Sequence, residues 1–268
     1  MRRRALLAAA AAAGVSAAVG TAGAAQAATG RPALFVIPHP DDETLAAGVV
    51  IAEHVAAGRD VHLLLLTRGE KSAVMDGLNG TGTMGWWGVT HNPQVEGYAP
   101  LTEATFGEAR RREITAAAGA LGVPADHIHE AGLPNEGVTV ASAKAAIVAC
   151  ATDIGADVGL WAPSHTVDNH ADHLAAGQAV RQLGTEDPVR WWDRRYYVLP
   201  MYWSDARLSK VDWWWDYAAN AQVTNRARNA TRAYQGWQPA NGMFAIGWHS
   251  TYSAFRTIEA DPKCLVHR

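Results

Sequence analysis

The chain has 268 residues, of which 49% are hydrophobic and 18% charged, and its formal net charge is −3. This composition excludes a disordered chain, a collagen-like fibre and a coiled coil. The slightly negative charge leaves no strongly basic surface for a phosphate backbone, so we expect no nucleic acid partner. Two cysteines are too few for a disulfide scaffold or a cysteine-based zinc finger, although Cys150 and Cys264 could pair outside the cytoplasm.

Residues 1–27 predict a secretory signal peptide. Arginines at positions 2–4 form a charged start, an Ala/Val-rich stretch follows, and Ala25-Gln26-Ala27 is a small-x-small cleavage pattern. The arginine cluster adds twin-arginine export to the general secretory (Sec) route as a candidate pathway. A membrane anchor is disfavoured because the apolar stretch is weakly hydrophobic. We therefore expect a secreted protein that is not stably inserted in a membrane, with residues 28–268 as a single domain.

The rest of the chain predicts a sheet with helices on both faces. Helical patterns at 44–57 and 103–121 end at a glycine. The alternation of strands and helices indicates an α/β fold, Rossmann-like, with a mostly parallel sheet and an irregular, Trp-rich C-terminal part. Ligands of such sheets bind beyond the carboxyl ends of the strands. Further helices are expected at 141–154 and 171–183, and strands at 33–37, 61–67, near 128, 158–161 and 196–199.

The first cluster of ionisable residues follows the first strand directly, in Pro38-His39-Pro40-Asp41-Asp42-Glu43. Burying these side chains at the end of a buried strand is costly unless something binds them. A divalent metal would do so, because His39 and Asp42 can converge across a tight turn. Asp41 would then stay off the metal, where a second carboxylate can act as a general base. Taken alone, such an acidic run at a helix start is equally compatible with simple capping.

The second cluster follows the strand near Trp161. His170 and His173 are three residues apart at the start of a helix, so both can face one site, while Asp168 or Asn169 caps the helix. One of these histidines would complete a His/Asp/His set with an open position, as in catalytic zinc sites. The other could stabilise an oxyanion. Because both clusters follow strands of one sheet, they favour a shared metal site over two surface features.

These residues resemble a known family. Pro38-His39-Pro40-Asp41-Asp42-Glu43, with His170-Ala171-Asp172-His173 downstream, is similar to the motifs of PIG-L/LmbE-like zinc-dependent deacetylases, which remove N-acyl groups from amino sugars and related glycosides. The resemblance extends to Thr67-Arg68-Gly69-Glu70 and to Arg110-Arg111-Arg112-Glu113, and it covers roughly residues 32–183. It implies an LmbE-like fold and an N-acetylglucosaminyl deacetylase activity.

The resemblance also implies a role for each motif residue. His39, Asp42 and His173 would bind Zn²⁺, although such a donor set also accepts iron or cobalt. Asp41 would be the general base for the attacking water. His170 would stabilise the tetrahedral intermediate or protonate the leaving amine.

Two positions are less clear in this comparison. Arg110 would touch sugar hydroxyls, or it would form only an i,i+3 ion pair with Glu113. Some relatives place a tyrosine two residues before the first histidine of the second motif, where this chain has Asp168. A tyrosine role would therefore come from elsewhere or be absent.

A long stretch at 71–102 is expected to be a lid or wall of the site, because it follows the second strand and is rich in Gly, Thr, Asn and Trp. Trp86, Trp87, His91 and Tyr98 are its candidate substrate contacts; alternatively, core tryptophans anchor the loop. The chain has 11 Trp, and their flat faces suit sugar rings or an aromatic aglycone. We expect a small-molecule glycoside as the partner, such as a cell-wall fragment or, preferably, a glycopeptide antibiotic bearing an N-acylglucosamine.

Other functional classes fit less well. The mature chain has no Gly-x-Ser-x-Gly serine-hydrolase motif and no His-Glu-x-x-His. A Gly-x-Gly-x-x-Gly match at 80–85 follows no predicted strand, which argues against a dinucleotide site. A secreted carbohydrate-binding module would use the tryptophans but leave the His/Asp motifs unexplained. A metal-dependent esterase or amidase acting on a non-sugar substrate stays an alternative, and the oligomeric state is not predicted.

Overall fold

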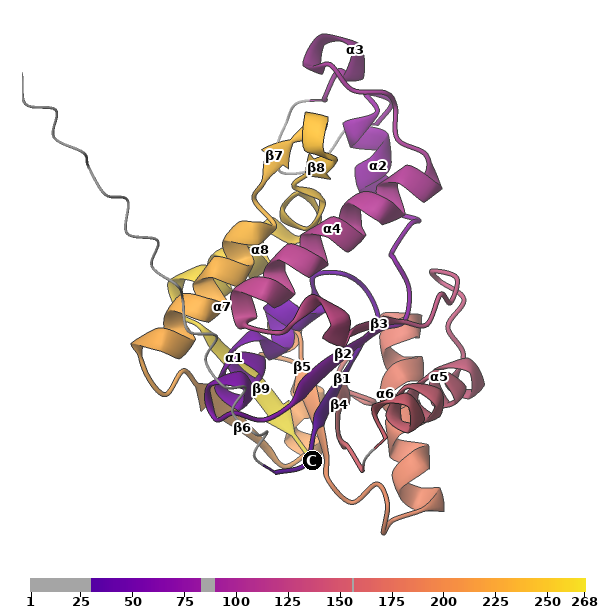
Figure 1. Ribbon diagram of the computed structural model, residues 1–268, viewed down its shortest axis with the longest axis vertical. Coiled ribbons are helices and arrows are strands. Elements are labelled where there is room, and N and C mark those ends of the chain that lie inside the picture. The colour runs from indigo at the N-terminus through magenta and orange to yellow at the C-terminus, as the bar shows by residue number, and fades with distance from the viewer. Residues whose placement is uncertain (1–29, 83–89, 156) are drawn as a thin grey trace, which may run out of the picture.

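A seven-stranded sheet forms the centre of the computed structural model, which describes residues 30–82, 90–155 and 157–268 (Figure 1). The predicted signal peptide, residues 1–27, lies outside the described residues. The strand order is β3-β2-β1-β4-β5-β9-β6; β1 to β5 are parallel to one another, and β9 pairs antiparallel with both β5 and β6. The strands are β1 Ala33–Ile37, β2 Val61–Leu65, β3 Ile128–Glu130, β4 Gly159–Pro163, β5 Arg194–Val198, β6 Trp213–Tyr217 and β9 Lys263–His267.

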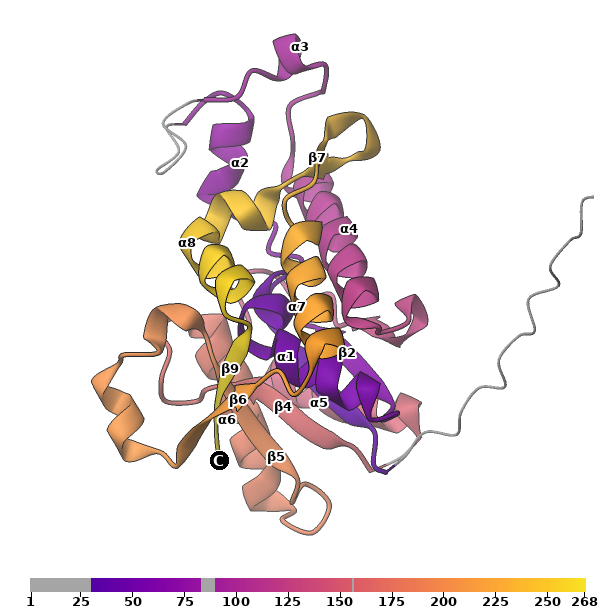
Figure 2. The same cartoon turned by 90° about the vertical axis from the view of Figure 1, so that its left-hand side faces the viewer.

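Helices cover both faces of the sheet, as the sequence predicts. Phe35 and Ile37 point into one apolar cluster, while Leu34 and Val36 point into the other, because successive side chains of a strand alternate. On the first face α7 packs between α4 and α8 (Figure 2). The first face carries α1 Asp42–Ala56, α4 Glu103–Leu121, α7 Ala221–Ala233 and α8 Ile246–Ala260, and the second carries α5 Val140–Ile154 and α6 Ala171–Glu186.

Local signals explain where these helices begin and end. Thr102 caps α4 by accepting the backbone N–H of Thr105, and the helix ends at Gly122, whose φ of 95° is in the left-handed region. Thr139 caps α5 in the same way. The predicted helices and strands up to residue 199 are therefore confirmed to within a few residues, and the α/β fold class with them.

The prediction of an irregular C-terminal part is wrong. Residues after 199 contain α7, α8 and two strands that complete the sheet, β6 and β9. The strand signal was hidden because β6 is the half-exposed run Trp213–Tyr217 and its partner β9 lies far along the chain. This part also holds β7 Trp237–Gln238, β8 Met243–Phe244 and the short 3-10 helices η2 Pro200–Tyr202, η3 Ala206–Lys210 and η4 Pro239–Asn241.

Several remaining features bear on the expectations above. Cys150 and Cys264 are both free and buried, and they belong to clusters on opposite faces of the sheet, so they do not pair. The stretch 71–102 holds two short helices, α2 Ala73–Leu78 and α3 Pro93–Glu96. Within the part of the chain that the structure describes, no helix is both long and apolar enough to cross a bilayer.

Candidate active site

The two predicted motifs meet at the carboxyl ends of β1 and β4, which are neighbours in the sheet. Asp41 occupies the N-cap of α1 with a φ of 115°, a left-handed conformation that costs a non-glycine residue about 1–3 kcal/mol. This turn bends the chain so that Asp42 begins α1 and its Oδ2 accepts the backbone N–H of His39 at 2.9 Å. Strain of this kind is typical of functional sites.

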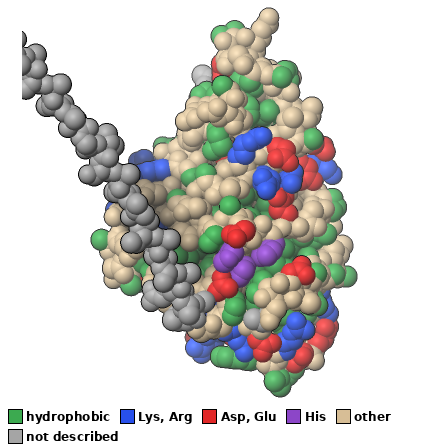
Figure 3. All heavy atoms as spheres, viewed as in Figure 1, with side chains coloured by type: hydrophobic (Ala, Val, Ile, Leu, Met, Phe, Trp, Pro, Cys, Tyr) green, Lys and Arg blue, Asp and Glu red, His purple; other side chains and the backbone are tan. Residues whose placement is uncertain are grey.

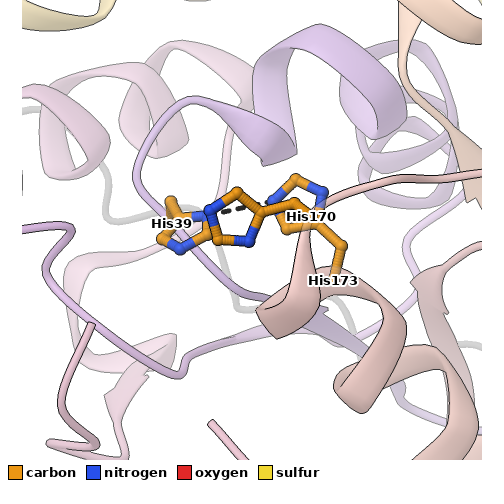
Figure 4. A group of neighbouring side chains, drawn as sticks. All are labelled: His39, His170 and His173. Carbon is orange, nitrogen blue, oxygen red and sulfur yellow. Dashed lines mark hydrogen bonds between the residues drawn. The ribbon is translucent and has the colours of Figure 1, made fainter. Parts of the chain in front are cut away.

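Three donor atoms converge beside this turn. His39 Nδ1 lies 2.9 Å from His173 Nε2, and Asp42 Oδ2 lies 3.6 Å from the first nitrogen and 3.3 Å from the second. Figure 4 shows the rings of His39, His170 and His173 gathered between the β1–α1 turn and the start of α6. Donors on a four-coordinate zinc with bonds of about 2.0–2.1 Å lie about 3.3 Å apart, so these separations fit such an ion.

Two further carboxylates fix the orientation of the ligating rings. Asp172 Oδ2 lies 3.2 Å from His39 Nε2, and Asp168 Oδ2 lies 2.9 Å from His173 Nδ1. When each imidazole donates its N–H to its carboxylate, the other nitrogen presents a lone pair to the centre. Two lone pairs and the Asp42 carboxylate then face one another, an arrangement that requires a cation.

The pKa shifts show the same demand for positive charge. Burial acts to lower the pKa of His173, but Asp42 and Asp168 raise it to about 10. Burial acts to raise the pKa of Asp42, and the two histidines outweigh it and lower that pKa. A protonated His173 therefore supplies the positive charge of the site when no metal is bound. We conclude that His39, Asp42 and His173 suit a borderline divalent metal such as zinc.

Asp41 stays off this set of three donors, as the sequence predicts. Its Oδ2 accepts a hydrogen bond from Arg110 Nη2 at 3.1 Å, and its backbone N–H donates to Glu43 at 3.1 Å. Burial raises the pKa of Asp41 to about 7, while the charge of Arg110 opposes this rise. A carboxylate whose pKa lies near neutrality can both take and return a proton.

Arg110 is buried, and its hydrogen bonds go to the protein. Its guanidinium donates to the carbonyl oxygens of Gly69 and Pro40 as well as to Asp41, although it also lines the cavity described below. Gly69 has a φ of 61°, in the left-handed region that favours glycine, and a Cβ there would also meet the Arg110 guanidinium. The expected ion pair with Glu113 is not formed, since Glu113 instead accepts the backbone N–H groups of Ile246 and Gly247 at the start of α8.

His170 is the N-cap of α6, so the expectation that Asp168 or Asn169 caps this helix is wrong. Its Nδ1 accepts the backbone N–H of Asp172 at 3.2 Å, which leaves Nε2 as the N–H donor of the neutral ring. Burial lowers the pKa of His170, and the charges of His39 and His173 act in the same direction. The exposed ring lies 4.6 Å from that of His39 and can therefore donate a hydrogen bond to a ligand beside the metal position.

A cavity of about 250 Å³ opens over these residues. Its walls include Lys71 and Glu136, and a break in the helical geometry of α8 at Thr251 contributes to the far side. Tyr202 of η2 lines this cavity. In some relatives a tyrosine stands two residues before the second motif, whereas this tyrosine comes from a different part of the chain. Neutral hydrogen-bonding groups on the walls belong to Ser72, Asn135, Tyr202, Ser250 and Thr251.

Two of the predicted substrate contacts from the 71–102 stretch, His91 and Tyr98, lie away from the cavity, although Lys71 and Ser72 of the same stretch line it. The His91 ring stacks on Trp237 with centroids 4.3 Å apart, and the Tyr98 hydroxyl donates to the Leu78 carbonyl at 2.6 Å. Neither residue lines the cavity; both pack into a small cluster with Phe244 and Trp237, which supports the alternative that this stretch is anchored by aromatic packing. Trp86 and Trp87 lie outside the described residues. The described tryptophans are likewise absent from the cavity wall.

Sequence reasoning missed the orienting carboxylates. Asp172 was seen only as part of His170-Ala171-Asp172-His173, and Asp168 only as a capping residue or as a departure from relatives. A signal for Asp172 was available, because a ligating histidine usually donates its second N–H to a carboxylate. No sequence signal pointed to Tyr202 or Thr251, which reach the site from the C-terminal part.

Comparisons with known sequences agree with this geometry. The family model described as PIG-L: GlcNAc-PI de-N-acetylase matches residues 34–183. A 1D-myo-inositol 2-acetamido-2-deoxy-alpha-D-glucopyranoside deacetylase of Rhodococcus opacus (strain B4) is 30% identical over 209 residues, which are 68% of this chain and 64% of the relative. A relative of the same description from Mycobacterium sp. (strain KMS) is 39% identical, but the match spans only 25% of that protein's length.

Solved structures share the fold. A deacetylase triple mutant (Orf2*T) of the teicoplanin biosynthetic pathway has a TM-score of 0.60 at 16% identity, over 88% of this chain and 96% of that one. GalB, the 4-carboxy-2-hydroxymuconate hydratase of Pseudomonas putida KT2440, has a TM-score of 0.54 at 17% identity, over 86% and 88% of the two chains. A deacetylase and a hydratase on one fold show that the chemistry must be argued from the site.

The match to the family model shows which family the chain belongs to. It spans more than half of the chain and includes both the Pro38–Glu43 turn and the His170–His173 segment that meet in the site. The chain therefore belongs to the PIG-L (GlcNAc-PI de-N-acetylase) family.

Proposed function

We propose that the chain is a metal-dependent hydrolase that removes the N-acetyl group of an N-acetylglucosamine-type glycoside. The observation that carries this proposal is the convergence of His39 Nδ1, Asp42 Oδ2 and His173 Nε2 within 2.9–3.6 Å, beside a carboxylate that is not one of the donors. The family and its deacetylase relatives support an amino sugar as the substrate.

Zinc is the metal that we propose for this set of donors. When bound, it would polarise the amide carbonyl and activate water. The protein holds the other groups in place: Asp172 and Asp168 keep the ligand rings turned inward, and the Glu43 carboxylate accepts the Asp41 backbone N–H.

Asp41 carries the proton transfers, and His170 stabilises the developing negative charge. Asp41 accepts a proton from the attacking water, and its position beside Arg110 fixes the carboxylate for this transfer. His170 donates its Nε2 hydrogen bond to the oxygen of the tetrahedral intermediate, since Nδ1 is engaged by Asp172. The proton then passes from Asp41 to the leaving nitrogen, which gives acetate and a free amino sugar.

The substrate proposal goes beyond what the cavity alone defines. Hydroxyl and amide groups on its walls suit a sugar ring, and its volume of about 250 Å³ admits a small glycoside portion with the rest outside. A glycopeptide antibiotic or another secreted glycoside stays our preferred class. Residues 1–27 support export of the protein, and contacts from Trp86 and Trp87 are proposed on the sequence alone.

The first prediction concerns the general base. Asp41→Asn keeps the size of the side chain but cannot accept the proton, so we expect zinc content to be unchanged and kcat to fall by about 10²–10⁴-fold. Acetate release from N-acetylglucosamine glycosides and metal analysis of the same sample measure the two quantities. Full activity of the zinc-loaded variant would refute the assignment of Asp41.

Substrate comparison separates the alternatives. Faster release of acetate from O-acetyl than from N-acetyl sugars would favour the esterase alternative. Binding of glycosides with no hydrolysis and no dependence on a chelator would favour the carbohydrate-binding module.

A further inference from the structure

We propose that the chain has a second transition-metal site, formed by Asp60, His62 and His127 at the opposite end of the sheet from the candidate active site. Each of these side chains offers one donor atom, and the three atoms all lie within 4.8 Å of one another. Asp60 precedes β2, and its carbonyl accepts the N–H of Ala33 at the start of β1. The five-residue strand β2, about 16 Å long, therefore separates this cluster from the active-site end.

One carboxylate lies between two imidazoles in this cluster. Asp60 Oδ2 is 3.3 Å from His62 Nε2, and Asp60 Oδ1 is 3.3 Å from His127 Nδ1. His62 belongs to β2 and His127 to η1 (Ala125–His127), so the carboxylate joins two elements. Two imidazoles with one carboxylate are a common donor set for zinc.

The strongest observation is an unpartnered nitrogen. His62 is only 7% exposed, and its Nε2 makes no hydrogen bond although Asp60 Oδ2 is near, so the two atoms are close but not aligned. Leaving such a buried polar atom unsatisfied costs about 1–3 kcal/mol. A metal ion between His62 Nε2 and the Asp60 carboxylate would be coordinated by both.

A fourth residue orients the buried ring. His62 Nδ1 lies 3.0 Å from His129 Nε2, so a proton on His62 Nδ1, donated to His129, leaves a lone pair on His62 Nε2. Ligating histidines typically use their second nitrogen in this way.

The remaining ligand has room to adjust. The rings of His62 and His127 stack with centroids 4.2 Å apart and planes 14° apart, and His127 Nδ1 donates to the carbonyl oxygen of Val61 at 3.1 Å. To share an ion with His62, His127 must therefore turn out of the stack and give up this hydrogen bond. Its side chain is 28% exposed. Figure 3 shows histidine side chains beside acidic ones at the surface, where Figure 1 draws the edge of the sheet near β2 and β3. An ion can therefore reach this cluster from solvent.

The donor types select the ion, and the elements suggest its role. Imidazole nitrogens favour zinc, nickel or copper over magnesium and calcium, which prefer oxygen donors. The site would pin η1, and with it the three-residue edge strand β3, to β2. We infer a stabilising metal clamp that takes no part in the hydrolysis.

Zinc titration of the untagged, chelator-stripped protein tests the proposal. We expect two equivalents bound by the unmodified chain and one by His127→Ala, with acetate release by His127→Ala within twofold of the unmodified chain. Asp60→Asn provides a second variant and should weaken zinc binding at this site by at least about tenfold. His165→Ala, in neither candidate metal group of the described residues, is the matched control and should still bind two equivalents.

A His39→Ala background separates this proposal from the proposed catalytic site. That variant should bind one equivalent, which raises its melting temperature, and both effects should vanish in His39→Ala/His127→Ala. A single equivalent lost with His39→Ala and retained in His127→Ala and Asp60→Asn would overturn the second site. A single equivalent lost only with His127→Ala would instead support the second site and contradict zinc binding by the catalytic residues.

Discussion

Two carboxylates that do not reach the metal position, Asp172 and Asp168, determine the orientation of the ligating His39 and His173 rings. Asp172 accepts from the backbone N–H groups of Glu136 and Val138, at 2.9 Å and 3.1 Å, while its Oδ2 lies within hydrogen-bonding distance of His39. The loop before α5 is thereby tied to the ligand ring. The geometry of the site thus depends on a segment that contributes no metal ligand of its own.

Replacing Asp172 should therefore weaken metal binding. Asp172→Asn keeps the shape but removes the charge that holds His39, so we expect zinc affinity to fall by about 10–100-fold. Competition with a chromophoric chelator measures the change, and Asp261→Asn on an exposed turn serves as the control. Equal affinities in the two variants would contradict the role of Asp172.

Arg110 should control the pH dependence of the base. Its positive charge lowers the pKa of Asp41 against the larger effect of burial, so Arg110→Gln should raise that pKa further. Asp41 must be ionised to accept a proton, and the acidic limb of the kcat/KM profile should therefore move to higher pH. Activity that falls equally at every pH would indicate that Arg110 only supports the fold.

The motif residues could be foreseen because their spacing is local. Asp41 and Asp42 share one turn, and His170 and His173 share one face of α6, so side-chain direction follows from secondary structure. The hydrogen-bond partners of Arg110 could not be foreseen in this way. They include the carbonyl oxygens of Pro40 and Gly69, which the tertiary fold brings to α4.

At the scale of elements, α6 must lie very close to β4 for its histidines to reach the site. A Cβ at Gly177 would lie 2.5 Å from the carbonyl oxygen of Pro163 and 2.7 Å from the backbone nitrogen of His165. These are backbone atoms, which cannot turn aside as a flexible side chain can. Gly177 therefore sets the distance between the helix and the sheet.

Gly177→Ala should push α6 away from the sheet and cost about 1–3 kcal/mol of unfolding free energy. Because His170 and His173 begin the same helix, zinc affinity should also fall. Gly119→Ala in α4 is a matched control, since its Cβ would meet nothing within 4 Å, and it should leave stability unchanged or improve it. Urea unfolding of both variants measures the difference, and equal free energies would contradict the close packing.

Element prediction succeeded where a strand is buried on both faces and a helix carries its own caps. Residues 103–121 form a helix with the predicted bounds because Thr102 and Gly122 mark both ends. It failed for Trp213–Tyr217, where the edge strand is half exposed and tryptophan suggested a ligand surface. Such a strand is defined by its partner β9, and pairing between distant segments is not written in local sequence.

At the scale of the whole molecule, the half-buried histidine His54 links stability to pH. His54 of α1 packs edge-on against Trp161, with centroids 5.4 Å apart, and burial, with help from the charge of Arg59, lowers its pKa to about 4. The unfolded chain takes up this proton near its ordinary pKa of 6.5, whereas the folded chain resists until about pH 4. Stability from this group is therefore lost as pH falls from above 6.5 towards 4.

His54→Leu should flatten that acid sensitivity, because the apolar side chain binds no proton in either state. We expect the difference in melting temperature between pH 7.5 and pH 5 to be smaller in the variant than in the unmodified chain, both measured with chelator to silence the metal sites. An equal difference in the two proteins would show that His54 does not contribute to acid unfolding.

The position of β9 has a consequence for how the molecule is made. Residues 263–267 lie between β5 and β6 in the sheet, although both of those strands precede them by a long stretch of chain. While the ribosome is still adding this segment, β5 lacks a neighbour on one side and β6 has no place in the sheet, so two unpaired strand edges stay open. The sheet can therefore be completed only after residues 263–267 have been made, and we expect a nascent chain at the stage before this to bind chaperones that shield exposed strand edges.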